Sequence, residues 1–134
     1  MISIIITSFK EPDTIGKCIE SVISQRIDHD YELIVSAPDI ETLMVAKSYR
    51  DLNSRIKLFK DPGKGKSYAL NLIFKKLKGD VFILTDGDVY MSDGSINAIM
   101  EHFRDSNVGC VTGRPVPQED RNDQYGYWAN FLFD

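Results

Sequence analysis

Four short and nearly uninterrupted apolar runs restrict the fold of this chain more than any other feature. They are SIIIT (3–7), YELIVS (31–36), RIKLF (55–59) and DVFILT (80–85). Strands that helices cover on both faces read as continuous apolar runs, whereas strands with one face in water alternate between apolar and polar residues. The runs therefore predict strands of a parallel sheet that is buried on both faces. A weaker run, VGCVTG (108–113), predicts a fifth strand.

Helical patterns occupy the intervals between the predicted strands. The first has apolar residues at the spacing of one helix face: Ile15, Cys18, Ile19, Val22 and Ile23. Further helices are predicted over 39–50, 69–77 and 96–103. The alternation of strands and helices predicts an α/β fold, a Rossmann-like, open and mostly parallel sheet with helices on both faces. Sheets of this kind bind ligands beyond the carboxyl ends of their strands.

Length and composition exclude several classes of protein. A chain of 134 residues is long enough for one compact domain and too short for two of ordinary size. The net charge of −4 argues against nucleic acid as a main partner. Cys18 and Cys110 have no metal-binding spacing, which predicts two small buried side chains in a reducing compartment. The sequence shows no signal peptide and no apolar run of the roughly 20 residues that span a membrane, so we expect a cytoplasmic protein without a transmembrane segment.

Two carboxylates follow the fourth apolar run, in the sequence TDGDV. Asp86 and Asp88 are separated by Gly87, and in an extended segment side chains two residues apart point the same way. Mg²⁺ and Mn²⁺ prefer oxygen ligands, and Mg²⁺ typically takes one or two carboxylates together with substrate phosphates and water. The pair predicts a divalent metal shared with a phosphorylated ligand. The alternative is a polar turn in which Asp86 caps the loop and Asp88 is solvated.

A loop rich in glycine and lysine, KDPGKGKSYALN (60–71), joins the third strand to the next helix. Exposed backbone N–H groups at Gly63 and Gly65, together with the helix N-terminus and the Lys66 charge, predict a phosphate cradle. The alternative is a solvated basic loop. A Walker A loop requires glycine at the position of Lys60, but a P-loop NTPase stays open as a weaker alternative because VFILTD resembles a strand that ends in a metal-binding aspartate.

Taken together and in this order, four segments resemble the family 2 glycosyltransferases of the GT-A fold, over residues 2 to about 115. They are SIIITSFKEPDTIGKCIESVISQ, YELIVSAPD, GKGKSYALN and GDVFILTDGDVYMSDGSI. The family transfers a sugar from a nucleotide-diphosphate donor to an acceptor with inversion, usually with Mg²⁺ or Mn²⁺. The resemblance implies that Thr7 and Glu11 lie near the nucleoside and that Lys66 approaches base or phosphate. It also places Asp86 at the ribose or donor sugar and Asp88 on the metal that bridges the diphosphate.

The second strand departs from the family pattern. In the family this strand commonly runs into an acidic pair followed by Gly-Ser, with a carboxylate that reads the base. Here the chain reads SAPD, so Asp39 is the one carboxylate available for that role. The sequence therefore leaves open whether the donor is a UDP-sugar or a GDP-sugar.

The family's acceptor half, with its downstream catalytic base, has no counterpart in this sequence. Glu119 and Asp120 form an acidic pair, but they follow Asp88 too closely to be identified as that base, and the catalytic residue stays unnamed. We therefore expect a nucleotide-sugar-binding domain over 1–115 and an aromatic tail over 116–134 that begins an acceptor half or serves association. A tail helix would be apolar nearly all round, which predicts burial against a partner chain, such as a homo-oligomer, or against further sequence.

The leading hypothesis is an inverting glycosyltransferase domain that binds a nucleotide-diphosphate sugar through a divalent metal and serves an acceptor that the sequence does not identify. A nucleotide-sugar-binding module without transfer activity is the alternative, ahead of the P-loop NTPase.

Overall fold

The structure is a computed structural model, and it describes residues 1–133. The chain divides into two compact units, Met1–Asn97 and Ala98–Asp134. The first contains β1 (Ile2–Thr7), α1 (Ile15–Ile23), β2 (Tyr31–Ala37), α2 (Ile40–Leu52), β3 (Ile56–Lys60), α3 (Lys66–Phe74) and β4 (Val81–Asp86). Helix α4 (Ser95–His102) spans the boundary, and α5 (Gln124–Phe133) belongs to the second unit.

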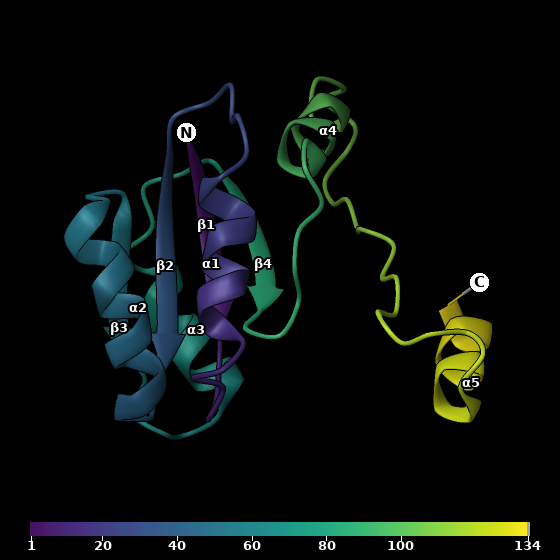
Figure 1. Ribbon diagram of the computed structural model, residues 1–134. Coiled ribbons are helices and arrows are strands. Elements are labelled where there is room, and N and C mark those ends of the chain that lie inside the picture. The colour runs from purple at the N-terminus through teal and green to yellow at the C-terminus, as the bar shows by residue number, and fades with distance from the viewer. Residues whose placement is uncertain (134) are drawn as a thin grey trace. The chain divides into compact units, whose positions relative to one another are not determined.

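The first unit is a parallel sheet of four strands in the order β3-β2-β1-β4. Helices α1 and α2 cover one face and α3 covers the other (Figure 1). This arrangement confirms the predicted α/β fold. The chain moves from β1 outward to β3 and then returns to the other side of β1 to form β4, so the order in which strands are added to the sheet reverses between β1 and β4. Ligands of open α/β sheets bind at such a reversal, beyond the carboxyl ends of the strands.

The core is built around β1, whose residues are all buried. Ile2, Ile4 and Ile6 alternate with Ile5, so β1 supplies apolar side chains to both faces of the sheet. On the α3 face, Ile5 packs with Ile34 and Ile73. Burying such a side chain stabilises the fold by about 1.5–3 kcal/mol. The continuous apolar run that predicted β1 is thus explained by its central position.

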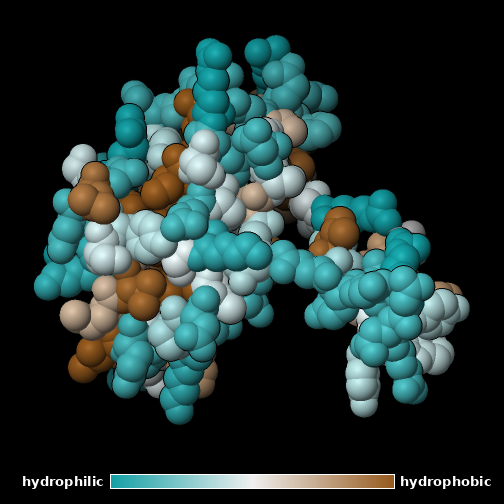
Figure 2. All heavy atoms as spheres, in the orientation of Figure 1, coloured by the Kyte–Doolittle hydropathy of each residue, from teal (hydrophilic) through white to brown (hydrophobic). Residues whose placement is uncertain are grey.

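The register brings three strand ends to one edge of the sheet. Thr7, the last residue of β1, pairs with Ser36 of β2 on one side and with Asp86 of β4 on the other. The loops that follow these strands therefore leave the sheet side by side. The face shown in Figure 2 is largely hydrophilic, with smaller apolar areas between the polar side chains. Ile40 and Met44 of α2 are among the exposed apolar residues.

Two expectations about residues 108–113 were wrong. This segment forms no strand, and Cys110 is exposed, whereas Cys18 is buried as predicted. The segment contains Gly109 and Gly113, which lower the strand propensity, and within the described residues it has no strand partner. A short apolar run that finds no neighbour to pair with leaves its side chains in water.

The second unit ends in the helical tail. Helix α5 leaves most of its apolar side chains exposed, and these are Tyr125, Tyr127, Trp128, Phe131, Leu132 and Phe133. Asn130 is buried and donates hydrogen bonds to the carbonyl groups of Glu119 and Gly126, which holds the preceding loop against the helix. The division into a binding domain over 1–115 and a tail over 116–134 is one of function, and it stays a prediction. Among the described residues, none of the helices has the length and hydropathy to cross a membrane.

Candidate functional site

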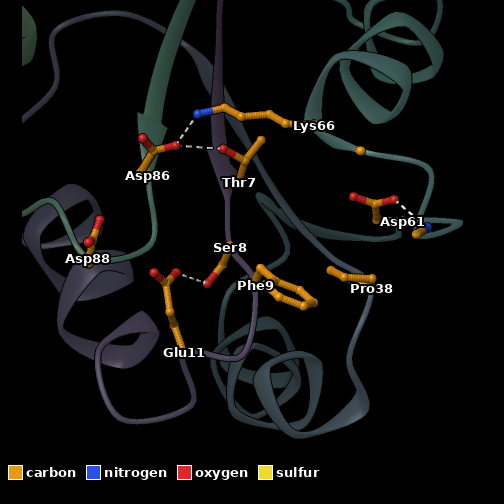
Figure 3. A pocket seen from close by; sticks show the side chains of 11 residues that line it. Thr7, Ser8, Phe9, Glu11, Pro38, Asp61, Lys66, Asp86 and Asp88 are labelled. Carbon is orange, nitrogen blue, oxygen red and sulfur yellow. Dashed lines mark hydrogen bonds and ion pairs between the residues drawn. The ribbon is translucent and has the colours of Figure 1, made fainter.

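A cavity of about 510 Å³ opens at the carboxyl edge of the sheet, a size in the range of small-molecule sites. Segments that follow all four strands line it: Thr7, Ser8, Phe9, Glu11, Pro38, Asp61, Gly63, Gly65, Lys66, Asp86 and Asp88 (Figure 3). Five of the residues predicted for the site therefore meet in one cavity, and they are Thr7, Glu11, Lys66, Asp86 and Asp88.

Asp86 is held in place by hydrogen bonds from two other elements. The Thr7 hydroxyl donates to Asp86 Oδ1 over 2.8 Å, and the Lys66 ammonium group donates to the same oxygen as an ion pair. Partial burial favours a higher pKa for Asp86, but the hydrogen bonds from Lys66 and Thr7 and the Lys66 charge outweigh it and lower the pKa below its usual value. Asp86 is therefore an oriented and ionised carboxylate.

Gly87 lets the loops after β1 and β4 approach closely. Its N–H donates to the Thr7 carbonyl over 2.9 Å, and Ser8 Oγ donates to Glu11 Oε2 over 2.5 Å directly beside it. A Cβ atom at Gly87 would overlap Ser8 and lie 2.7 Å from Glu11 Oε2. The glycine between the two aspartates is thus required by the side chains packed against it.

Asp88 lies on the turn after β4 and is exposed. Residues 87–88 form a turn rather than an extension of the strand, closed by the Val89 N–H to the Asp86 carbonyl at 3.1 Å. The two aspartates consequently lie apart, Asp86 on the strand end and Asp88 over α1 (Figure 3), although both line the cavity. The prediction that they project together as on one strand was wrong, because the strand ends at Asp86.

Cys18 lies beneath this turn, and the sequence did not mark it as part of the site. Its thiol donates to the Asp86 carbonyl over 3.4 Å. Burial, reinforced by the nearby Asp88, Glu11 and Asp86 carboxylates, raises the pKa of Cys18 to about 12. Cys18 is therefore a neutral thiol that supports the turn from α1.

These carboxylates suit a metal that is shared with a ligand. Within residues 1–133 there is no group of three or more His, Cys, Asp or Glu side chains that could hold a metal ion alone. Asp86 and Asp88 both line the cavity, and Mg²⁺ takes one or two carboxylates when phosphates and water complete its shell. The donor set fits a phosphate-bridged divalent ion and does not fit a closed structural metal site.

The loop between β3 and α3 lines the cavity next to these acids. Gly63 and Gly65 have φ values of 74° and 96°, which strongly favour glycine. Gly65 caps α3 without a side chain, so the first N–H groups of the helix stay available to an anion, and Lys66 begins the helix. This geometry is the one expected of a phosphate cradle.

The remaining wall of the cavity was missed at the sequence level. Phe9 and Pro38 form an apolar surface, with Phe9 63% exposed, and Asp61 accepts a hydrogen bond from the Gly63 N–H over 2.7 Å. Phe9 and Asp61 each follow a predicted strand closely, and this position at a strand end is the signal that could have identified them.

Asp39 lies beside the cavity and does not line it. Its carboxylate accepts hydrogen bonds from the Thr42 N–H, the Thr42 hydroxyl and the Lys10 N–H at 3.0, 2.5 and 2.8 Å, which caps α2. Although desolvation favours a higher pKa for Asp39, these hydrogen bonds lower it. A role for Asp39 toward a nucleoside stays a prediction, as does the identity of a catalytic base.

Comparison with known proteins identifies the fold and the family. The chain is 28% identical over 116 residues to the "Uncharacterized glycosyltransferase EpsJ" of Bacillus subtilis (strain 168). This match covers 82% of this chain and 33% of that protein. It superposes on the mannosyltransferase PcManGT from Pyrobaculum calidifontis, solved with GDP-Man and Mn²⁺, with a TM-score of 0.73 at 18% identity, covering 84% of this chain and 36% of that one. For S. aureus TarS 1-349 in complex with UDP-GlcNAc the TM-score is 0.64 at 21% identity, covering 91% of this chain and 38% of that one.

The chain thus spans about a third of the length of these relatives. The superpositions confirm the GT-A fold that the sequence motifs implied. A family model for glycosyl transferase family 2 matches residues 3–132, which is nearly the whole chain. The protein therefore belongs to glycosyl transferase family 2.

Proposed function

We propose that this chain is the donor-binding part of an inverting glycosyltransferase and that it binds a nucleotide-diphosphate sugar together with Mg²⁺ or Mn²⁺. The observation that carries the proposal is a cavity whose lining brings Asp86 and Asp88 together with the glycine-rich loop and Lys66. Acids next to phosphate-binding groups suit a diphosphate that shares a cation with the acids.

Each wall of the cavity has a distinct task in this proposal. Asp86 and Asp88 hold the metal, which when bound stabilises the charge of the departing nucleoside diphosphate. Lys66 and the N–H groups at the start of α3 hold the phosphates. Phe9 offers an exposed ring against which a base can stack.

A binding module without transfer is the second candidate. Three of the four acids that line the cavity already accept hydrogen bonds from protein groups: Glu11 from Ser8, Asp61 from Gly63, and Asp86 from Thr7 and Lys66. An inverting transfer needs a base within hydrogen-bond reach of the acceptor hydroxyl. Acids that already accept hydrogen bonds from the protein are less available as that base, which favours binding without transfer. The P-loop NTPase is no longer a candidate, because the chain belongs to a glycosyltransferase family.

Calorimetric titration of the 134-residue chain with GDP and UDP, with and without Mn²⁺, tests the proposal. We expect binding that requires Mn²⁺, and we expect Asp88→Ala to abolish the metal-dependent part while circular dichroism stays unchanged. Asp93→Ala is the matched control, since Asp93 is exposed and does not line the cavity. Equal binding with and without Mn²⁺ would contradict the proposal. Release of nucleoside diphosphate from a sugar nucleotide favours the transferase, and binding without release favours the module.

Two further elements belong to the proposal. The exposed aromatic side chains of α5 support self-association or docking through the tail. Both cysteines are free thiols, which supports a reducing, cytoplasmic location.

A further inference from the structure

The side of the cavity away from Asp86 and Asp88 combines an apolar surface with one carboxylate. Asp61, Phe9 and Pro38 lie together on one side of the cavity, and Asp86 and Asp88 lie on the other (Figure 3). A nucleotide whose diphosphate occupies the acidic side directs its base toward this opposite side. The inference that follows therefore rests on the proposed function.

The surface on that side suits a flat aromatic ring. Phe9 is 63% exposed and lines the cavity with Pro38, so an apolar face is presented to the ligand. Stacking of a base on an aromatic side chain contributes affinity for every base, because every base has a π-face. Stacking holds a base here without selecting one, and selection requires hydrogen bonds to its edge.

Asp61 is the carboxylate that has an oxygen available for those hydrogen bonds. Its Oδ1 accepts from the Gly63 N–H, and among the described residues its Oδ2 accepts no hydrogen bond. In Figure 3 one oxygen of Asp61 lies on the dashed line, and the other points away from it, toward the side on which Thr7 lies. Asp39, by contrast, accepts three hydrogen bonds at the α2 cap and does not line the cavity.

A carboxylate distinguishes the bases by their donors. Guanine presents two adjacent donors, N1–H and the N2 amino group, which one carboxylate can accept together. Uracil presents a single N3–H between two carbonyl oxygens that repel a carboxylate, and adenine presents one amino group next to a ring acceptor. Hydrogen bonds to a charged acceptor are roughly twice as strong as neutral ones, so the difference is large enough to select a base.

We propose that Asp61 reads the base of the donor and makes this site specific for guanine nucleotides. The Gly63 N–H orients the carboxylate, Phe9 and Pro38 hold the ring, and the Watson–Crick edge of guanine meets Asp61. The residue that selects the base thus follows β3, in the loop that also holds the phosphates.

Asp61→Asn is the informative variant. The side-chain carbonyl of Asn still accepts from the Gly63 N–H, while its amide NH₂ group puts a donor where the second carboxylate oxygen was an acceptor. That donor mismatches the N2 amino group of guanine and matches the O2 carbonyl of xanthine. The titrations use GDP, UDP, ADP and xanthosine diphosphate with Mn²⁺ on the 134-residue chain. Asp93→Asn is the matched control for loss of one exposed charge.

For the unmodified chain we expect GDP to bind at least about tenfold more tightly than UDP or ADP. Asp61→Asn is expected to weaken GDP by about tenfold to a hundredfold and to strengthen xanthosine diphosphate, a gain that misfolding cannot produce. If UDP binds the unmodified chain as tightly as GDP, the inference is overturned and the proposed function stands. The same holds if Asp61→Asn leaves the ratio of the dissociation constants for GDP and xanthosine diphosphate unchanged. Absence of Mn²⁺-dependent binding for all four diphosphates overturns both.

Discussion

Lys66, in the first turn of α3, forms an ion pair with Asp86 at the end of β4, although 20 positions separate them in the sequence. The pair joins the basic loop to the acidic strand end across the cavity. In the proposed complex a divalent cation pairs with Asp86 and a phosphate pairs with Lys66, so each partner of this ion pair gains a new partner of opposite charge. Either ligand group binding alone would leave Lys66 or Asp86 without its partner. When both bind together, neither charge is left unpaired, which favours metal-dependent binding of a diphosphate.

Replacing Lys66 tests this relationship. Lys66→Met removes the charge that we propose binds phosphate. We therefore expect the dissociation constant for a nucleoside diphosphate with Mn²⁺ to rise by about tenfold to a hundredfold, as for the loss of a charge-assisted hydrogen bond. Isothermal titration measures it. Lys64→Met is the matched control, because Lys64 packs over Tyr68 and does not line the cavity. Equal losses in both variants would show that only the overall charge of the loop matters.

A methyl group at Gly87 is expected to separate the two loops of the site. Gly87 does not have a positive φ, so Gly87→Ala acts only through its overlap with Ser8 and Glu11. Overpacking of this kind costs about 1–3 kcal/mol in the free energy of unfolding, which urea denaturation measures. Gly109→Ala serves as the control because a Cβ there meets no atom within 4 Å. Partial recovery of stability by adding Ser8→Gly is expected, and no recovery would assign the loss to another cause.

Glu32 predicts an acid-sensitive contribution to stability. This buried carboxylate accepts hydrogen bonds from Ser3, Lys57 and the Lys78 N–H at 2.7, 2.5 and 2.8 Å. Burial favours a higher pKa for Glu32, but the hydrogen bonds and the Lys57 charge lower the pKa below its ordinary 4.5. The unfolded chain therefore takes up the proton first as the pH falls, and the contribution of Glu32 is present above pH 4.5 and lost as the pH drops through the folded-state pKa.

Urea denaturation between pH 7 and pH 3 measures this contribution. Between those pH values the unmodified protein is expected to lose about 1 kcal/mol more than Glu32→Gln, a modest value because Lys57 is 45% exposed and its ion pair is screened by water. Parallel pH profiles for the two proteins would show that Glu32 does not titrate on unfolding.

The aromatic face of α5 is expected to mediate association. Trp128 and Phe131 are 56% and 63% exposed, and their rings pack edge to face with their centroids 6.0 Å apart. At micromolar concentration, gel filtration is expected to show a species larger than the 15.2 kDa monomer, and Trp128→Ser with Phe131→Ser is expected to restore the monomer. Leu52→Ser is the control, since Leu52 is 91% exposed at the end of α2. A monomeric unmodified chain would contradict the association.

The sequence by itself determined the sheet and the meeting of its strand ends. β1 to β4 are formed at the four strongest runs. The predicted burial on both faces holds for β1 and β2, but not for the edge strand β4, whose Phe82 and Leu84 are 51% and 47% exposed. Sheets of this kind bind ligands beyond the carboxyl ends of their strands, and the family resemblance implied that residues after different strands meet there. Thr7, Lys66 and Asp86 do so, held by hydrogen bonds that the register makes possible.

Only the tertiary structure decided which polar groups at that edge line the cavity. Asp39 follows β2 as expected, yet the N-terminus of α2 takes up its carboxylate, while Asp61 in the next loop turns toward the cavity. The run at 108–113 has strand-like residues but found no neighbouring strand, which left Cys110 in water. A local pattern records the preference of a segment, and the packing around the segment decides whether a partner satisfies that preference.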